Sequence, residues 1–215
     1  MGETEFVYEK KVSACALDRA CLELLQQRLV QEGAETISFA VGCGKEVLQD
    51  GREVEEFPDL QAACDRLEQP FASLVIAATF TEGKMLVLEL HNFMPAGGLL
   101  RLSGKESWGQ DLAEWILEQL KERRRVFTAF CYNRIGFALL QTGVPFLAAS
   151  VIVVVVAGIV IPGEIRRSSW SGWITAGCLV LTLRVAYSIS NWLLRKLVER
   201  QPFLQWIKSV KKESV

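Results

Sequence analysis

Histidine is nearly missing from this chain of 215 residues, which contains one, His91. Its cysteines include no C-x-x-C pair; they are Cys15, Cys21, Cys43, Cys64, Cys131 and Cys178. A zinc site needs histidines or cysteines paired at short spacing, so neither a metal site nor a cofactor is expected. The G-x-S-x-G, H-E-x-x-H and protein-kinase motifs are also missing. The sequence therefore contains no recognisable catalytic residues, and we do not expect an enzyme.

The first residues, MGETEFVYEKK, lack the apolar run of a secretory signal peptide. With two cysteines near or in the apolar half of the chain, a secreted disulfide framework fits poorly. We expect reduced thiols on a cytosolic domain.

Acidic residues are scarce in the second part of the chain. Residues 121–215 carry 4 Asp and Glu against 14 Lys and Arg, whereas residues 1–120 carry 21 against 10. A domain with this acidic excess is repelled by phosphate backbones, so no nucleic-acid partner is expected.

Charge is missing altogether from residues 135–161, a run of 27 residues. A helix of that length is roughly 40 Å long, more than the ~30 Å hydrocarbon core of a bilayer. The alternative is a buried helix of a soluble protein, which rarely needs so many consecutive apolar residues. We predict a first transmembrane helix over 135–161.

Tryptophans mark a second transmembrane helix, predicted over 170–194. Trp173 and Trp192 lie 19 residues apart, roughly 28 Å of helix, which places one indole at each membrane interface. Trp170 adds to the outer interface, and a short external loop is expected over 162–169.

Basic residues set the predicted orientation. Arg123, Arg124 and Arg125 precede a basic interfacial neck at 126–134, where they are expected to face anionic lipid of the inner leaflet. Positive charge is rare in the 162–169 connection and frequent on both flanks, so both termini are expected in the cytoplasm. We predict an integral protein of the plasma (inner) membrane with two spans. The basic amphipathic tail at 195–215 is expected to break at Pro202 and then to form an interfacial helix. For its last ten residues the alternative is a plain charged tail.

The acidic part, residues 1–125, reads as an α+β domain with helices on a mainly antiparallel sheet. Period-two and helical spacing of apolar residues predict the element order β-α-β-β-α-β-β-β-α. Strands are expected near residues 6–12, 36–41, 73–80, 85–93 and 98–104, a hairpin over 47–57, and helices near 17–29, 58–69 and 107–125. A turn is expected at Asp50–Gly51.

Arg184 is a charge inside the predicted second span. Counted back from Trp192 it lies about 12 Å inside the inner interface, where an arginine needs a partner or a route to water. One hypothesis is a helix–helix contact in which Arg184 bonds the Gln141 side chain, or the backbone carbonyl that Pro145 leaves without a donor. The alternative is that the side chain extends to the cytosolic headgroups.

Two functions from different classes fit these patterns. The first is a membrane-anchored cytosolic interaction or sensing module without catalytic activity, which binds a protein partner or a second copy of the chain. The second is a membrane effector whose transmembrane hairpins oligomerise into a pore on a signal from the soluble domain, suggested by Arg184 and by the small residues Gly172, Ala176 and Gly177. A third alternative is an enzyme whose site the sequence does not reveal.

Overall fold

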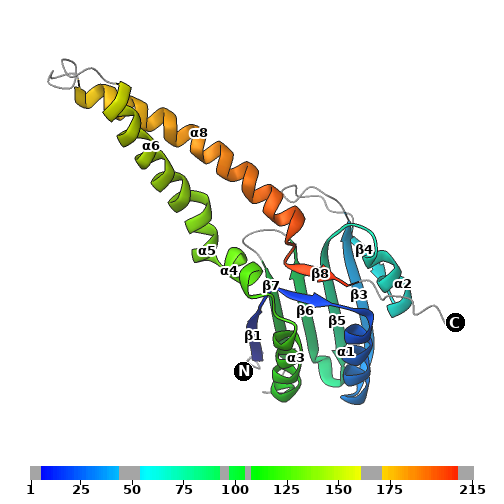
Figure 1. The fold of residues 1–215 in the computed structure, drawn as a ribbon. Coiled ribbons are helices and arrows are strands. Elements are labelled where there is room, and N and C mark those ends of the chain that lie inside the picture. Colours follow the sequence, from blue (N-terminus) through cyan, green and yellow to red (C-terminus); the bar gives the residue numbers. More distant parts are fainter. Residues whose placement is uncertain (1–5, 44–53, 93–96, 105–107, 161–170, 208–215) are drawn as a thin grey trace. The chain divides into compact units, whose positions relative to one another are not determined.

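The computed structural model describes residues 6–43, 54–92, 97–104, 108–160 and 171–207 (Figure 1). The chain divides into two compact units. The first, which we call the α+β domain, combines Met1–Tyr132 with Gln201–Val215, and the second, the hairpin unit, is Asn133–Arg200. The α+β domain therefore contains the chain segments on both sides of the hairpin unit.

A six-stranded sheet forms the α+β domain, in the order β1-β7-β6-β5-β3-β4. Its strands are β1 (Phe6–Val12), β3 (Ala34–Cys43), β4 (Val54–Phe57), β5 (Phe71–Phe80), β6 (Met85–His91) and β7 (Gly98–Gly104). All neighbouring strands are antiparallel. The predicted α+β class with a mainly antiparallel sheet is confirmed. The predicted turn at Asp50–Gly51 lies outside the described residues.

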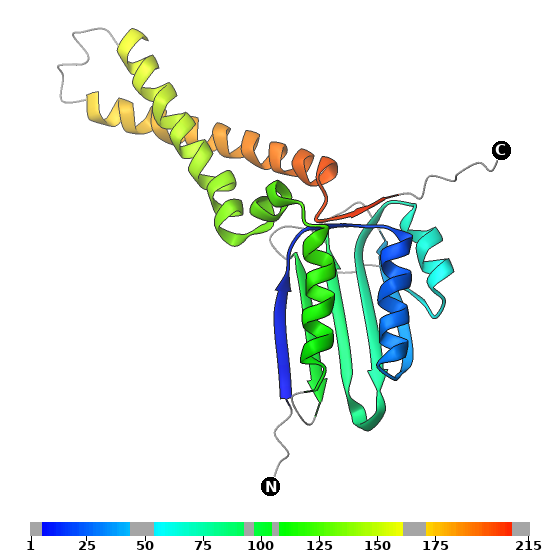
Figure 2. The ribbon, with the colours of Figure 1, turned by 60° about the horizontal axis from the view of Figure 1, so that its bottom comes forward.

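Helices α1 (Arg19–Gln31) and α3 (Gln110–Glu122) lie side by side on one face of this sheet (Figure 2). Helix α2 (Leu60–Leu67) packs beside β3 and β4, and η1 (Thr81–Gly83) joins β5 to β6. Alternate residues of the central strands face the helices and form the core, among them Leu74, Ile76, Leu86, Leu88, Leu90, Leu100 and Leu102. Full burial of one such side chain stabilises the fold by about 1.5–3 kcal/mol.

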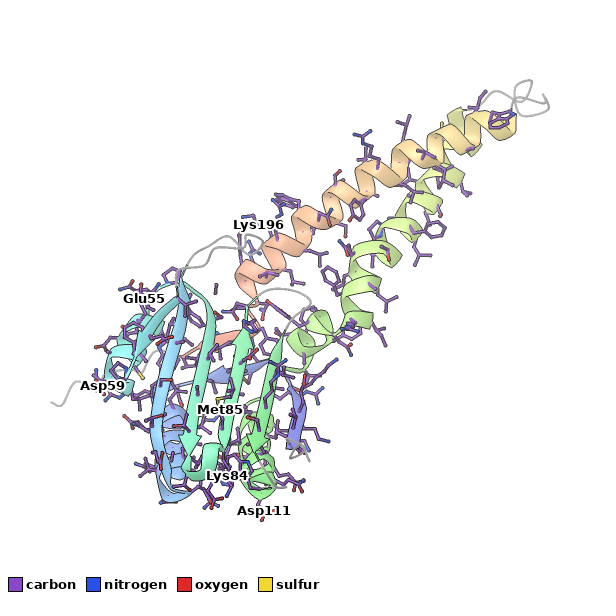
Figure 3. The ribbon with its side chains drawn as sticks, turned by 180° about the vertical axis from the view of Figure 1, so that it is seen from behind. Glu55, Asp59, Lys84, Met85, Asp111 and Lys196 are labelled. Atoms are coloured by element: carbon purple, nitrogen blue, oxygen red, sulfur yellow. The ribbon has the colours of Figure 1, made fainter. Side chains whose placement is uncertain are left out.

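The opposite face of the sheet carries no helix from the described part of the chain (Figure 3). Val87 and Leu99 are half-buried there. Arg101 lies between two carboxylates of neighbouring strands, 3.8 Å from Glu9 and 3.6 Å from Glu89. Such partly exposed ion pairs contribute little to stability.

A second, smaller sheet was not predicted. Strands β2 (Cys15–Leu17) and β8 (Leu204–Trp206) pair in parallel. The prediction of an interfacial helix after Pro202 is wrong for these residues, because Phe203 and Leu204 are buried in the α+β domain (3% and 0% exposed). The predicted break holds, since the preceding helix ends at Arg200.

The hairpin unit contains two helical arms. The first runs through α5 (Arg134–Ala138), the π-helical turn η2 (Leu139–Gly143) and α6 (Val144–Val160), and the second is α8 (Ser171–Arg200). In the α+β domain, α4 (Val126–Tyr132) precedes the first arm. Both arms, over Arg134–Val155 and Gly172–Arg200, are long and apolar enough to cross a membrane.

Candidate functional site

Strand β2 is the middle strand of a small junction inside the α+β domain. Its first neighbour is the incoming segment, Arg123–Arg125, which leads toward the hairpin unit. The N–H of Ala16 donates to the Arg123 carbonyl over 3.1 Å, and the N–H of Arg125 donates to the Ala14 carbonyl over 2.8 Å. This side of β2 therefore holds the chain before it enters the hairpin unit.

The other side of β2 binds the returning segment, Gln201–Ile207, which follows the hairpin unit. The N–H of Cys15 donates to the Phe203 carbonyl over 3.1 Å, and the N–H of Ile207 donates to the Leu17 carbonyl over 2.8 Å. A strand of 3 residues thus bonds both flanks of the hairpin unit. We call β2 with the incoming and returning segments the β2 junction.

Asn92 supports the returning segment from the end of β6. Its side-chain oxygen accepts the N–H of Leu204 over 2.7 Å, and its side-chain N–H donates to the Phe71 carbonyl over 3.4 Å. Its backbone N–H donates to the Ala72 carbonyl over 2.8 Å, and its own carbonyl accepts the Tyr132 hydroxyl over 3.5 Å. Asn92 is 8% exposed. A buried amide with this many partners fixes the position of each of them.

Two arginines connect the junction to the rest of the domain. The Arg125 guanidinium donates to the Pro202 carbonyl over 3.0 Å and to the side-chain oxygen of Gln201. Arg123 lies 3.0 Å from the Asp18 carboxylate, which also accepts the first-turn N–H of α1. The incoming segment is therefore tied both to the returning segment and to the start of α1.

Phe203 fills the centre of the junction. Its ring lies 5.3 Å from the Tyr132 ring, centroid to centroid. A Cβ added at Gly97 or Gly98 would come within 3.1 or 3.0 Å of the Phe203 ring, and at Gly98 also within 2.9 Å of Val12. The two glycines leave the space that the phenylalanine occupies, since any larger residue there would overpack it.

Burial raises the pKa values of two ionisable groups in the β2 junction. Burial raises the pKa of the Cys15 thiol to about 12, aided by the neighbouring Cys21 and opposed by Arg123 and Arg125. Burial likewise raises the pKa of Tyr132 to about 12. Both groups are neutral near pH 7, and a protonated thiol is a poor nucleophile.

The described residues contain one histidine, which lies beside a carboxylate. No group of three or more His, Cys, Asp or Glu side chains there is close enough together to hold a metal ion. The Nε2 of His91 lies 3.5 Å from the Glu89 carboxylate on the same strand. These two side chains do not supply enough ligands to hold a metal ion.

Polar contacts join the two arms of the hairpin unit at η2. The N–H of Val144 donates to the Leu139 carbonyl in the π-helical turn. That shift leaves the Leu140 carbonyl free for another donor, and the Ser190 hydroxyl of α8 donates to it over 2.8 Å. The Leu140 carbonyl, which lacks its usual backbone donor within the helix, therefore accepts a hydrogen bond from the neighbouring helix.

Gln141 is the second polar link between the arms. Its side-chain amide donates to the Tyr187 hydroxyl over 3.2 Å and to the Asn191 side-chain oxygen over 3.5 Å. Among the described residues Gln141 forms no hydrogen bond with the Arg184 side chain. The structure thus pairs Gln141 with two residues of α8 that the sequence analysis did not select.

Arg184 and Pro145 do share a site. They line an open groove of about 630 Å³ in the hairpin unit, together with Thr142, Gly143, Phe146, Leu183 and Tyr187. The Arg184 side chain is exposed. The predicted role of Arg184, Gln141 and Pro145 as a helix–helix contact stays a prediction.

The predicted interface anchors are placed as follows. Trp173 and Trp192 are 77% and 59% exposed, and their contact with lipid headgroups stays a prediction. Trp170 lies outside the described residues. Arg123 and Arg125 bond protein groups in the β2 junction, so contact of Arg123, Arg124 and Arg125 with lipid stays a prediction.

The sequence analysis missed the residues that form the β2 junction. The adjacent glycines Gly97 and Gly98 were a usable signal, because two glycines at the start of a strand leave space for a bulky neighbour. In the hairpin unit, Tyr187 and Asn191 are spaced i and i+4 and therefore share one helix face. Neither signal predicts which other segment of the chain these residues contact.

Comparisons with protein-family models, with curated proteins and with solved structures find no match to this chain.

Proposed function

We propose that this protein is a membrane-anchored cytosolic interaction or sensing module without catalytic activity. In this proposal the α+β domain binds a partner and passes the resulting change to a two-helix transmembrane hairpin. The observation that carries the proposal is the β2 junction, in which one strand of 3 residues bonds both the incoming and the returning segment.

The energetics of the junction favour such coupling. The buried hydrogen bonds of β2 and Asn92 cannot open without leaving polar groups unsatisfied, at a cost of about 1–3 kcal/mol each. A flexible linker would have no such cost and would isolate the hairpin from the domain. A change in α1 has a direct route to the junction through Asp18 and Arg123.

The charge distribution supports a cytosolic position for the domain. The positive residues on both flanks of the two apolar helices favour cytoplasmic termini in the plasma (inner) membrane. The protein would then present its acidic domain to cytosolic partners, and its basic flanks to the anionic inner leaflet.

Spin-label distances in the full chain, reconstituted in nanodiscs, test the coupling. One pair at the exposed Val126 and Gln205 reports on the junction, and one at the exposed Leu139 and Leu193 reports on the hairpin unit. We expect Asn92→Ala to broaden both distance distributions, whereas Gln27→Ala on the exposed side of α1 changes neither. A broadened junction pair with an unaltered hairpin pair would refute transmission to the hairpin.

A second candidate is the pore-forming effector. The exposed Arg184 guanidinium on a candidate span supports it, because a charge there is stable if it faces water. Ion leakage from vesicles that contain the purified chain, abolished by Arg184→Leu, would favour the pore over the module.

A further inference from the structure

The groove beside Arg184 presents hydrogen-bond donors. Within the described residues the Arg184 guanidinium has no ion pair. The Tyr187 hydroxyl oxygen accepts a hydrogen bond from the Gln141 amide, so its own O–H remains available as a donor. The Thr142 hydroxyl already donates to the Ala138 carbonyl over 2.7 Å. An occupant that accepts hydrogen bonds, and carries negative charge, complements this arrangement.

In the sequence of the two helical arms, no acidic residue lies close enough to Arg184 to supply the charge. Between residues 135 and 200 the sequence contains only Glu164 and Glu199. Glu199 is bonded to Lys196 over 2.8 Å and lies 15 residues from Arg184, roughly 22 Å along a helix. Glu164 is 20 residues away in the other direction. A second copy would bring another arginine to the same depth, and like charges repel.

We propose that this groove docks a transmembrane helix of another protein that carries an aspartate or glutamate at mid-membrane depth. Arg184 pairs with the carboxylate, and the Tyr187 hydroxyl donates a second hydrogen bond. The apolar wall of the groove, which includes Leu183, Phe146 and Pro145, packs against the partner helix. The proposal rests on the membrane-anchored function above and names the chemistry of one partner.

Photo-cross-linking in vesicles tests this docking. The full chain is reconstituted in phosphatidylcholine with a minor fraction of phosphatidylglycerol, and flotation of the vesicles establishes insertion. The probes are polyleucine transmembrane peptides of about 20 residues with a photoreactive leucine, and with aspartate, asparagine or leucine at the centre. We expect about tenfold more cross-linked product for the aspartate peptide than for the leucine peptide, as charge-assisted hydrogen bonds require.

Variants assign the effect to the groove. Arg184→Leu is expected to remove the preference for the aspartate peptide, and Tyr187→Phe to reduce it. Arg195→Leu is the matched control, because it removes an exposed arginine of the same helix away from the groove. Equal cross-linking of the aspartate and leucine peptides to the unaltered chain would overturn the proposal and favour lipid phosphate as the partner of Arg184.

Two further results would also overturn it. If Arg184→Leu keeps the preference for the aspartate peptide, the carboxylate of that peptide binds outside the groove. Arg184-dependent anion leakage without peptide would place the side chain in a water-filled pore. A chain that does not float with the vesicles would contradict the membrane-anchored function itself, whereas flotation without discrimination between peptides contradicts the groove alone.

Discussion

At the scale of single residues, the α+β domain depends on buried polar groups that form hydrogen bonds, such as those of Asn92. Asn92 connects β5, β8 and the Tyr132 hydroxyl, although it is one polar residue after an apolar strand. The hydrogen bonds of Asn92 reach residues up to 112 positions away along the chain. Long-range pairing of this kind has no local sequence pattern, which is why the sequence analysis did not single out Asn92.

Replacing Asn92 with alanine is expected to destabilise the α+β domain. The N–H of Leu204 and the carbonyl of Phe71 would lose their partners in a buried place, so we expect a loss of about 2 kcal/mol in the free energy of unfolding. Urea unfolding of the detergent-solubilised chain, followed by circular dichroism, measures this loss. Gln27→Ala on the exposed part of α1 is the control, and equal midpoints for the two variants would contradict the role of Asn92.

The raised pKa values at the junction predict a fall in stability at alkaline pH. Cys15 and Tyr132 have pKa values of about 12 in the folded domain, against ordinary values of 9.0 and 10.0. Above about pH 9 the unfolded chain releases these protons first, so the free energy of unfolding falls as the pH rises toward about 12.

The slope contributed by one such group approaches 1.4 kcal/mol per pH unit between its two pKa values. Unfolding midpoints from about pH 8 to pH 11 measure the dependence. Cys15→Ala should make the alkaline fall shallower, whereas Gln27→Ala, which removes no ionisable group, should leave it unaltered. Identical profiles for the unaltered chain and Cys15→Ala would refute this assignment.

At the scale of elements, long helices and strands could be predicted from the sequence, and short strands could not. Period-two alternation identified β3, strong hydrophobicity identified β5 and β6, and helical spacing identified α1 and α3, because each of these elements buries apolar residues. Strands β2 and β8 have 3 residues each, too few to establish a period. The basic and apolar tail suggested an interfacial helix, but its apolar residues Phe203 and Leu204 are buried against protein instead of lipid.

The polar contact between the arms of the hairpin unit yields an element-scale prediction. Gln141→Leu and Tyr187→Phe each remove one side of the same hydrogen bond, so their effects on hairpin stability should not add. We expect a coupling energy of about 0.6 kcal/mol, with an upper range near 1.7, as for other hydrogen bonds between membrane helices. A double-mutant cycle in micelles, read by fluorescence transfer between α6 and α8, measures this energy.

The control for that cycle pairs Gln141→Leu with Ser188→Ala, since the Ser188 hydroxyl bonds the carbonyl of its own helix at Arg184. This pair should show additive effects. Additivity for Gln141→Leu with Tyr187→Phe as well would mean that the contact contributes nothing to helix packing in micelles.

At the scale of the whole molecule, the charge and hydropathy of the sequence predicted where the two long apolar helices lie. The uncharged run at 135–161 and the tryptophans of the second span located both long apolar helices. What the sequence did not predict is that the chain after the second helix returns to the α+β domain. That return is specified by the fit of Phe203 beside Gly97 and Gly98, which exists only after the sheet has formed.

The predicted topology has a direct consequence in cells. Protease added outside intact cells should leave residues 1–125 undigested, because the acidic domain is expected on the cytoplasmic side. Permeabilised cells are the control and should lose the domain. Digestion of the domain in intact cells, or release of the chain by alkaline carbonate, would contradict the two-span orientation.

Amide hydrogen exchange at Arg125 and Ile207, in the full chain in nanodiscs, tests the β2 junction most directly. Their N–H groups bond Ala14 and Leu17 on the two sides of β2. We predict that both amides are protected, and that Asn92→Ala accelerates exchange at both together. Exchange at Ile207 as fast as in an unstructured peptide, with Arg125 protected, would mean that the returning segment is not held and that the proposed coupling is wrong.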